Sequence, residues 1–344
     1  MTRLEHEITQ TSPLLDERGS LVQVGWARRP LLDCNLQAAR FSPIRFLQRY
    51  RVKRWDYYGV TSPDMFFSAT LADLGYAGQV FAYTVDFATG TYHEETVTVP
   101  LGKGITLARN STGGESRYAG RNVRASFRIE GEVRRVQVDW SDFGGRPLEA
   151  DLQFRLPAEH ESTVVVIPIG ERRFYYNRKV NCMPVAGTLQ IGDTTNQVDP
   201  ATSLGNLDWG RGVWDYDSFW VWASASGFLS DGRRAGLNMG FGFGDTTAAT
   251  EHTLLVEGRI HKLPQVAIDY DPDNFMRPWT MRSDRVDLTF VPFLERRALT
   301  NLLLIRSEVH QMFGRYEGTV IADDGETVTI DGLVGWAEEH QARW

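Results

Sequence analysis

The stretch 121–140, RNVRASFRIEGEVRRVQVDW, decides the fold class of this chain. In its first half Ala125, Phe127 and Ile129 alternate with polar residues, and a second alternating run follows Gly131. Because successive side chains of a β-strand point to opposite faces, each run is typical of a strand with one apolar face. Glycine tolerates the positive φ of a tight turn. The stretch therefore predicts two antiparallel strands joined as a hairpin.

The same period-2 pattern, with glycine-containing turns between the runs, extends over most of the chain. The runs that have it are 65–71, 79–87, 93–100, 121–130, 133–140, 149–156, 162–168, 172–177, 186–191, 219–224, 236–242, 253–257, 259–263, 286–292, 311–320 and 327–331. These are too many strands for one flat sheet. We expect an all-β protein of two consecutive antiparallel barrels or sandwiches, because closure removes exposed sheet edges.

A junction near 157–171 separates two β-rich halves, so we expect an N-terminal unit at 1–160 and a C-terminal unit at 161–344. Helical signals are few. A turn or two of helix is expected within 43–51 and a short helix at 199–206. The segment 332–342 follows Asp331, a plausible N-cap, and is expected to form a C-terminal helix or an ordered tail.

Composition limits the class of partner. With 344 residues, of which 42% are hydrophobic and 24% charged, the chain can bury a core and is expected to be globular. Its net charge is −7 and its basic residues are dispersed, which argues against nucleic-acid binding. The first residues lack the apolar core of a signal peptide, and no run of eighteen apolar residues predicts a membrane span. We therefore expect a cytoplasmic protein without a transmembrane segment.

Metal and nucleophile motifs are missing from the sequence. Cys34 and Cys182 are not in a Cys-x-x-Cys pair, and we expect both to be small buried residues. The seven histidines show no metal-binding spacing, so no metal or cofactor is expected. No Gly-x-Ser-x-Gly motif supports a serine nucleophile.

The segment 207–227, LDWGRGVWDYDSFWVWASASG, resembles the wall of a binding site more than any other stretch. It combines four tryptophans with three aspartates and an arginine, and buried charge is costly unless it is paired or used. As part of a strand, Trp220, Trp222 and Ser224 share one face. Two neighbouring indoles form a platform for apolar or sugar ligands, although large rings also fill ordinary cores. Trp209, Trp214 and Tyr216 are the other expected aromatic contacts to a small-molecule ligand.

Within this segment, Asp208 and Arg211 lie in what we interpret as a turn opened by two glycines. If Arg211 points elsewhere, Asp208 is the best general acid in the chain, because burial among indoles favours the protonated carboxyl. If the two residues pair, Asp208 orients other groups instead. Asp215 and Asp217 are an alternative carboxylate pair of the type that glycoside hydrolysis needs.

Polar residues in three other segments complete the predicted site. In 174–184, Lys179 is a candidate for stabilising negative charge, and Asn177 and Asn181 are candidates for binding ligand hydroxyls or carbonyls. Asn238 lies in 236–245, where glycine at every second position from 240 leaves one strand face bare and something must approach it closely. His310 is a candidate base or proton shuttle.

Six motifs together resemble the uncharacterised bacterial family DUF2804 over nearly the whole chain. They are GWARRP at 25–30, KRWDYY at 53–58, ADLGY at 72–76, YNRKVNC at 176–182, WVWAS at 220–224 and HQMFG at 310–314. The chain is more distantly similar to the lipocalin-like group of carotenoid hydratases, tocopherol cyclase and some Diels–Alder cyclases. That resemblance implies two calycin-type barrels or sandwiches, a cavity near their junction, and an acid that protonates an alkene or polarises a carbonyl. Asp208 fits this acid best by its chemistry.

Three functions are compatible with these residues. The first is a hydratase, cyclase or isomerase that acts without a cofactor on an apolar or amphipathic molecule, with Asp208 as proton donor. The second is a carbohydrate-active enzyme in which Asp208 acts with Asp215 or Asp217. The third is a non-catalytic lipid or isoprenoid carrier, whose cavity would be lined by apolar side chains alone.

Overall fold

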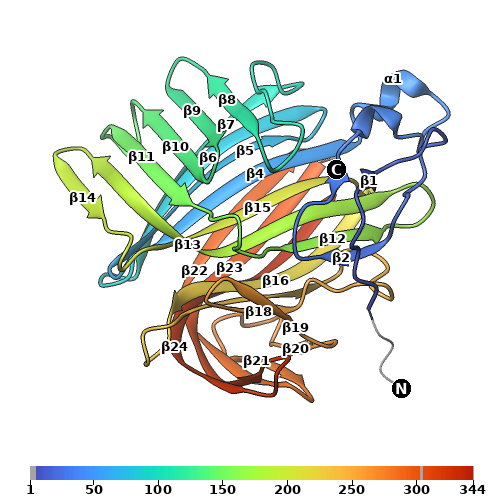
Figure 1. The fold of residues 1–344 in the computed structure, drawn as a ribbon. Helices are drawn as coiled ribbons and strands as arrows, with labels where there is room; N and C mark the ends of the chain where they lie inside the picture. The colour runs from blue at the N-terminus through green and yellow to red at the C-terminus, as the bar shows by residue number, and fades with distance from the viewer. Residues whose placement is uncertain (1–4, 303–304, 344) are drawn as a thin grey trace.

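The computed structural model describes residues 5–302 and 305–343, and nearly all of its chain forms β-strands (Figure 1). Among these residues, helical structure is confined to η1 (Leu36–Ala38) and α1 (Arg45–Gln48). Two large antiparallel sheets curl into half-barrels. The predicted all-β fold class is therefore confirmed, as is the short helical turn expected within 43–51.

The first large sheet takes its strands from the part of the chain before residue 214. These strands are β2 (Gly25–Ala27), β4 (Val52–Thr61), β5 (Met65–Asp73), β6 (Ala77–Asp86), β7 (Thr91–Pro100), β8 (Gly114–Ala119), β9 (Val123–Glu130), β10 (Val133–Trp140), β11 (Leu148–Arg155), β12 (Thr163–Pro168), β13 (Phe174–Ile191), β14 (Thr194–Val198) and β15 (Leu204–Val213). Their main order is β7-β6-β5-β4-β15-β13-β11-β10-β9-β8. The long strand β13 also pairs with β12 and β14, and β12 pairs with β2. A separate short parallel pair joins β1 (Ser12–Pro13) and β3 (Leu32–Asp33).

The second large sheet takes its strands from the rest of the chain. They are β16 (Asp217–Phe228), β17 (Arg234–Phe241), β18 (Thr253–Val256), β19 (Arg259–Lys262), β20 (Ala267–Asp269), β21 (Trp279–Ser283), β22 (Val286–Leu302), β23 (Ile305–Ile321) and β24 (Thr327–Arg343). Their order is β19-β18-β17-β16-β24-β23-β22-β21-β20. Strands β22, β23 and β24 are long, so they extend from the second half-barrel along the first sheet (Figure 1).

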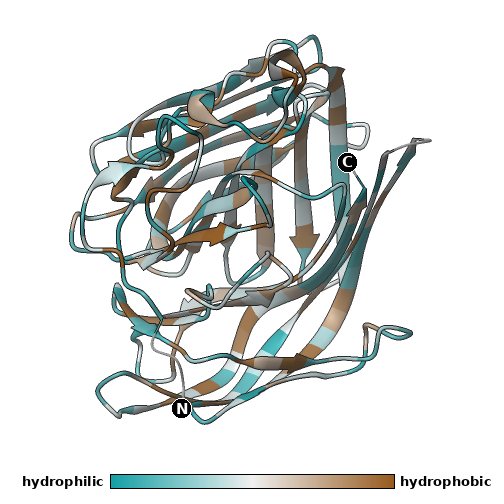
Figure 2. Cartoon of the chain, turned by 90° about the vertical axis from the view of Figure 1, so that its right-hand side faces the viewer, coloured by the Kyte–Doolittle hydropathy of each residue, from teal (hydrophilic) through white to brown (hydrophobic). Residues whose placement is uncertain are grey.

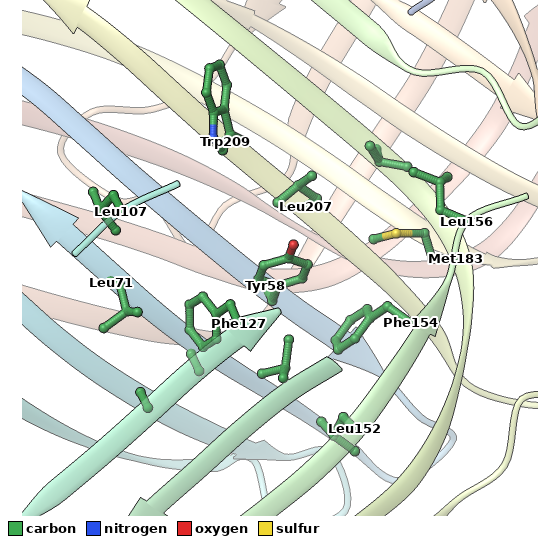
Figure 3. Close-up of a cluster of buried hydrophobic side chains, with 14 of the residues drawn as sticks. Tyr58, Leu71, Leu107, Phe127, Leu152, Phe154, Leu156, Met183, Leu207 and Trp209 are labelled. Carbon is green, nitrogen blue, oxygen red and sulfur yellow. The ribbon is translucent and has the colours of Figure 1, made fainter. Parts of the chain in front are cut away.

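Side-chain alternation divides the interior into three buried layers. Strand β15 sends Leu207 and Trp209 into the core enclosed by the first sheet (Figure 3), and Asp208 toward the space between the sheets. Strand β16 sends Trp222 into this middle layer and Val221 into the core of the second sheet. The same alternation is visible as teal and brown bands along the strands in Figure 2. Each strand that contacts the middle layer therefore also contributes to a half-barrel core.

Three local predictions are wrong. The segment 332–342 is not a helix but the end of β24, which is hydrogen-bonded between β16 and β23. The segment 199–206 is a turn, in which the Asp199 carboxylate accepts the Ala201 N–H, followed by the start of β15. The expected turn at 208–212 lies inside β15. In the last case the two glycines, which favour turns in isolation, are accommodated by the pairing of β15 with β13 and β4.

The proposed division into units at 1–160 and 161–344 remains a prediction. The change from one sheet to the other occurs between Val213 and Asp217, and β12 to β15 belong to the first sheet. No helix in the described part of the chain is both long enough and apolar enough to cross a membrane.

Candidate active site between the two sheets

A cavity of about 300 Å³ lies in the middle layer, between the two sheets. Strands β4, β5, β6, β13 and β15 line it from the first sheet, and β16, β22, β23 and β24 line it from the second. Its walls are mainly aromatic, formed by Trp55, Tyr57, Tyr76, Phe81, Tyr83, Tyr175, Trp214, Trp220, Trp222 and Phe243. The volume and the mixture of many rings with a few polar groups are typical of a small-molecule site.

Two glycines of β15 allow close packing against this strand. A Cβ atom on Gly210 would lie 2.1 Å from the Trp55 indole, and one on Gly212 would lie 2.4 Å from the Phe174 carbonyl oxygen. Neither glycine has a positive φ, so neither is needed for a turn. Gly210 thus lets the Trp55 ring pack against the sheet, where the ring forms part of the cavity wall, and Gly212 leaves room for the backbone of β13.

Asp208 and Lys179 form a buried ion pair on the first-sheet side of the cavity. The Lys179 Nζ lies 2.8 Å from the Asp208 Oδ2, and the Asn177 amide donates to Oδ1 at 2.6 Å. Lys179 on β13 and Asp208 on β15 can meet because they are opposite each other in the strand register. The partner of Asp208 is therefore Lys179, a pairing that neither of the two sequence-based alternatives for Asp208 included.

The ion pair also contacts the tryptophan platform of β16. Lys179 Nζ lies 3.7 Å from the centroid of the Trp222 ring, within the range of a cation–π interaction. The Trp222 Nε1–H donates to the Asn238 Oδ1 at 2.8 Å, and the Asn238 amide donates to the Glu251 carbonyl oxygen. Asn238 thus fixes the orientation of the Trp222 ring from behind the cavity wall.

Glu338, on β24, is a carboxyl group that lines the second-sheet side of the cavity. Its Oε2 accepts a hydrogen bond from the Gln311 amide at 3.0 Å, and its Oε1 accepts one from the Trp220 indole at 3.4 Å. Burial raises the pKa of Glu338 to about 7, although Arg296 and Lys179 oppose the shift. A carboxyl group with this pKa exchanges protons readily near neutral pH.

A chain of hydrogen bonds leads from Glu338 into the first sheet. The Gln311 Oε1 accepts from the Tyr83 hydroxyl at 3.0 Å, and the Tyr57 and Tyr83 hydroxyls lie 2.9 Å apart. Arg296 also donates to Gln311 and pairs with Glu94 at 2.6 Å. The two sheets are therefore connected through the site by a polar network as well as by the aromatic rings.

A second buried carboxyl group lies behind the wall. The oxygens of the Glu251 side chain accept no hydrogen bond from a described residue, and burial raises the pKa of Glu251 to about 7. Lys179 and Asp208 are its main electrostatic neighbours. A carboxyl group without donors is more stable in its neutral form.

Several predicted site residues face other layers. Trp209 and Arg211 alternate with Asp208 on β15 and point into the first-sheet core, where Arg211 pairs with Asp56 at 2.8 Å. Asn181 donates to the Ser224 hydroxyl and the Ala225 carbonyl across the sheets. His310 lies on the opposite face of β23 from Gln311, where it contacts Glu295 and stacks on Phe275.

The acidic residues after β15 lie at the surface. Asp215 pairs with Arg173 and Asp217 pairs with Arg343, with all four side chains at least partly exposed. Tyr216, between the two aspartates, is exposed as well. The carboxylate pair that the carbohydrate alternative required is therefore not assembled from these residues. A simple carrier would have a cavity lined by apolar side chains alone. The cavity between the sheets differs from this expectation, because Lys179, Asp208 and Glu338 line it.

The sequence-based reasoning placed Trp214, Trp220, Trp222, Lys179 and Asp208 in the site, and the cavity brings these five together. It missed Glu338, Gln311, Arg296, Tyr57 and Tyr83. Glu338 lies in the segment predicted as a helix, so the alternation of Trp336, Glu338 and His340 toward one face went unrecognised. Gln311 directly follows His310 and begins the predicted strand 311–320. We would have included it in the site if the alternation in this run had been used to predict which face of the strand is buried.

The cavity offers no cluster of metal ligands. Across residues 5–302 and 305–343, no group of three or more His, Cys, Asp or Glu side chains is arranged to hold a metal ion. What the arrangement supplies is a proton-exchanging carboxyl group, a charged carboxylate held by an ammonium group, and a wall of rings.

Comparisons with known proteins give structural neighbours and a family. No curated protein sequence matches the chain. Kievitone hydratase from Nectria haematococca is 11% identical, with coverage of 100% of this chain and 98% of that one and a TM-score of 0.48. CghA, solved with Sch210972, is 10% identical, with coverage of 85% and 88% and a TM-score of 0.41. The family described as domain of unknown function DUF2804 matches residues 5–344, so the chain belongs to the DUF2804 family.

Proposed function

We propose that this protein is an acid–base enzyme that protonates an alkene or carbonyl group of an apolar or amphipathic small molecule, and so catalyses a hydration, cyclisation or isomerisation. The observation that carries the proposal is Glu338, a buried carboxyl group with a pKa of about 7 on the wall of a ring-lined cavity. A carboxyl group of this kind is a strong enough acid to donate and is still protonated in part at neutral pH.

Glu338 takes the role of proton donor, which the sequence had suggested for Asp208. Its proton adds to one carbon of a double bond and leaves a positive charge on the other carbon. Water, a second double bond or loss of a neighbouring proton then consumes this charge. A proton returns to the site in each case, so the overall reaction needs no oxidant or reductant.

The aromatic wall stabilises the cationic intermediate. Trp220 and Trp222 lie on the same strand face as one another, and Trp214 packs on Trp220 with ring centroids 5.3 Å apart. The faces of such rings attract a positive charge, most strongly where water is excluded. The same rings favour substrates with an isoprenoid chain or an aromatic ring.

Asp208 acts as the base in this proposal. Lys179 and Asn177 fix the direction of its carboxyl group, so it orients the attacking water or accepts the proton that is lost. Glu338 and Asp208 can take the separate roles of acid and base because their carboxyl groups lie in different environments.

The proposal is tested by incubating the protein in D₂O with a panel of prenylated phenols and acyclic terpenoid alcohols and aldehydes. Liquid chromatography with mass spectrometry detects the addition of D₂O, or an isomer that has gained deuterium at carbon. We expect turnover of one class in the panel, and a decrease in kcat of ~10²–10⁴-fold for Glu338→Gln. The decrease in the wild-type kcat should follow loss of the Glu338 proton as the pH rises through about 7.

The matched control is Glu339→Gln. Glu339 is the next residue on β24 and points to the other face, where it accepts a hydrogen bond from the Tyr270 hydroxyl. This variant should retain wild-type turnover. Unchanged turnover by Glu338→Gln contradicts the proposed donor, and tight binding of panel compounds without any conversion supports a carrier instead.

A further inference from the structure

Two arginines are buried inside the first sheet without an acidic partner. Arg134 on β10 and Arg178 on β13 have 4% and 6% of their surfaces exposed. Arg134 shares a strand face with Val136, and Arg178 shares one with Tyr176 and Val180, all three of which belong to the core of this sheet. Neither guanidinium forms an ion pair with a carboxylate among the described residues. This core is separate from the cavity between the sheets.

The two guanidinium groups lie beside one another because they share an acceptor. Arg134 Nη2 and Arg178 Nη1 both donate to the carbonyl oxygen of Ser111, each at 3.1 Å. Arg178 also donates from Nε to the Ser162 hydroxyl at 3.1 Å. The Nε of Arg134 is buried and has no hydrogen-bond partner in the described chain. One buried N–H donor of this arginine pair therefore remains unused.

Nearby groups of the chain do not supply the missing negative charge. The Asp56 carboxylate is already paired with Arg211 and accepts the Ser116 hydroxyl. Burial raises the pKa of Tyr58 to about 12 and raises that of Tyr176 as well, so both stay neutral at physiological pH. The described residues in this region therefore do not balance the positive charges of Arg134 and Arg178.

Two adjacent cations in an apolar interior are unstable unless an anion accompanies them. Leaving a buried charge without a partner costs several kcal/mol, and the repulsion between like charges adds to this cost. Burial and Arg134 together lower the pKa of Arg178 to about 9, which still leaves it charged near neutral pH. Planar guanidinium groups with free N–H donors are well suited to bind a small anion between them.

We propose that Arg134 and Arg178 form a buried binding site for one small monovalent anion of the halide class, held also by the Ser111 hydroxyl. The anion stabilises the first half-barrel by linking β10, β13 and the loop between β7 and β8. This role is independent of the proposed chemistry in the cavity.

The site is tested by following thermal unfolding of the full chain at constant ionic strength while chloride replaces gluconate, a much larger anion. Raising chloride from about 10 to about 500 mM should raise Tm by ~2–4 °C, because a ligand that binds the folded state stabilises it. In Arg134→Met this increase should fall below ~1 °C. Arg135→Met is the matched control, since Arg135 is the next residue on β10 and forms an exposed pair with Asp151, and it should keep the full increase.

Crystals of the wild-type protein grown in bromide provide a test that does not depend on a variant folding. We expect an anomalous peak from bromide between the Arg134 and Arg178 side chains. Equal Tm values of the wild type in chloride and gluconate, or a full chloride effect in Arg134→Met, overturn the proposal. A water molecule alone at this position overturns it as well.

Discussion

The layer between the sheets and the core of the first sheet both bury charged side chains, but they balance the charge differently. In the layer between the sheets, Lys179 faces Asp208, and Arg296 faces Glu94. In the first-sheet core, Arg211 pairs with Asp56, whereas the partners that the described residues give Arg134 and Arg178 are backbone and hydroxyl oxygens. A buried cation can therefore belong to a cavity that also holds its acidic partner, or it can lack such a partner and be available to bind an added anion.

Removal of one cation from each region is the strongest test of this difference. Lys179→Met leaves Asp208 charged and buried, and should decrease the free energy of unfolding by ~3–5 kcal/mol. Arg134→Met removes a charge that has no acidic partner, so in gluconate it should be neutral or stabilising. Urea denaturation followed by tryptophan fluorescence measures both values. A cost below ~1 kcal/mol for Lys179→Met would show that the pair with Asp208 contributes little.

The variant Asp56→Asn removes the acidic partner of a buried arginine instead of the arginine itself. It deprives Arg211 of its charged partner, so it should destabilise the protein by ~3 kcal/mol and increase the dependence of Tm on chloride. Asp151→Asn serves as a control, because its pair with Arg135 is exposed and should contribute less than ~1 kcal/mol. If the Tm of Asp56→Asn depends on chloride in the same way as the Tm of the wild type and of Asp151→Asn, the charge of the first-sheet core is not linked to anion binding.

Gly210→Ala tests the packing of the cavity wall rather than its charge. The new methyl group would overlap the Trp55 indole, so the ring must move, at a cost of ~1–3 kcal/mol. Because Trp55 lines the cavity, binding of a hydrophobic fluorescent probe such as 1-anilinonaphthalene-8-sulfonate should change too. Gly113→Ala, where the added methyl group meets no atom within 4 Å, should leave both stability and probe binding unchanged.

The pH dependence of stability gives the smallest expected effect. The pKa of Glu338 is raised from 4.5 to about 7 in the folded state, so this group favours folding fully below pH 4.5 and loses that contribution as the pH rises through about 7. Between pH 5 and 8 the wild type should therefore lose on the order of 1–2 kcal/mol relative to Glu338→Gln. Glu251→Gln should behave similarly, since burial raises that pKa in the same direction. A parallel pH profile of the wild type and either variant contradicts the raised pKa of that residue.

The alternation of apolar residues was sufficient to predict the fold class and most strands. The run 133–140 coincides with β10, and the predicted shared face of Trp220 and Trp222 is confirmed by their common layer. The close approach expected at the glycines from 240 is confirmed too, because a Cβ atom on Gly240 would lie 2.5 Å from the Val221 carbonyl oxygen and 2.8 Å from the Phe243 ring. These results depend on local patterns, which the sequence contains directly.

Long-range strand pairing decides which residues form the site, and local sequence patterns do not predict that pairing. Asp208 and Arg211 are close in sequence, but they lie in different layers because β15 is a strand and not a turn. Lys179 reaches Asp208 only through the register of β13 and β15. Glu338 reaches the cavity only because β24 extends beyond the second half-barrel, and no short-range signal fixes the length of a strand.

Glu338 and Asp208 belong to separate hydrogen-bonded sheets, and the Tyr83–Gln311 hydrogen bond crosses the boundary between these sheets beside the site. The chemistry proposed for the cavity is therefore a property of the docked pair and of neither half-barrel alone. A fragment that ends before β16 retains the base and its lysine but has no donor. The proposed turnover would then depend on the contact between the sheets. A small displacement at that contact would abolish the proposed activity while both half-barrels remained folded.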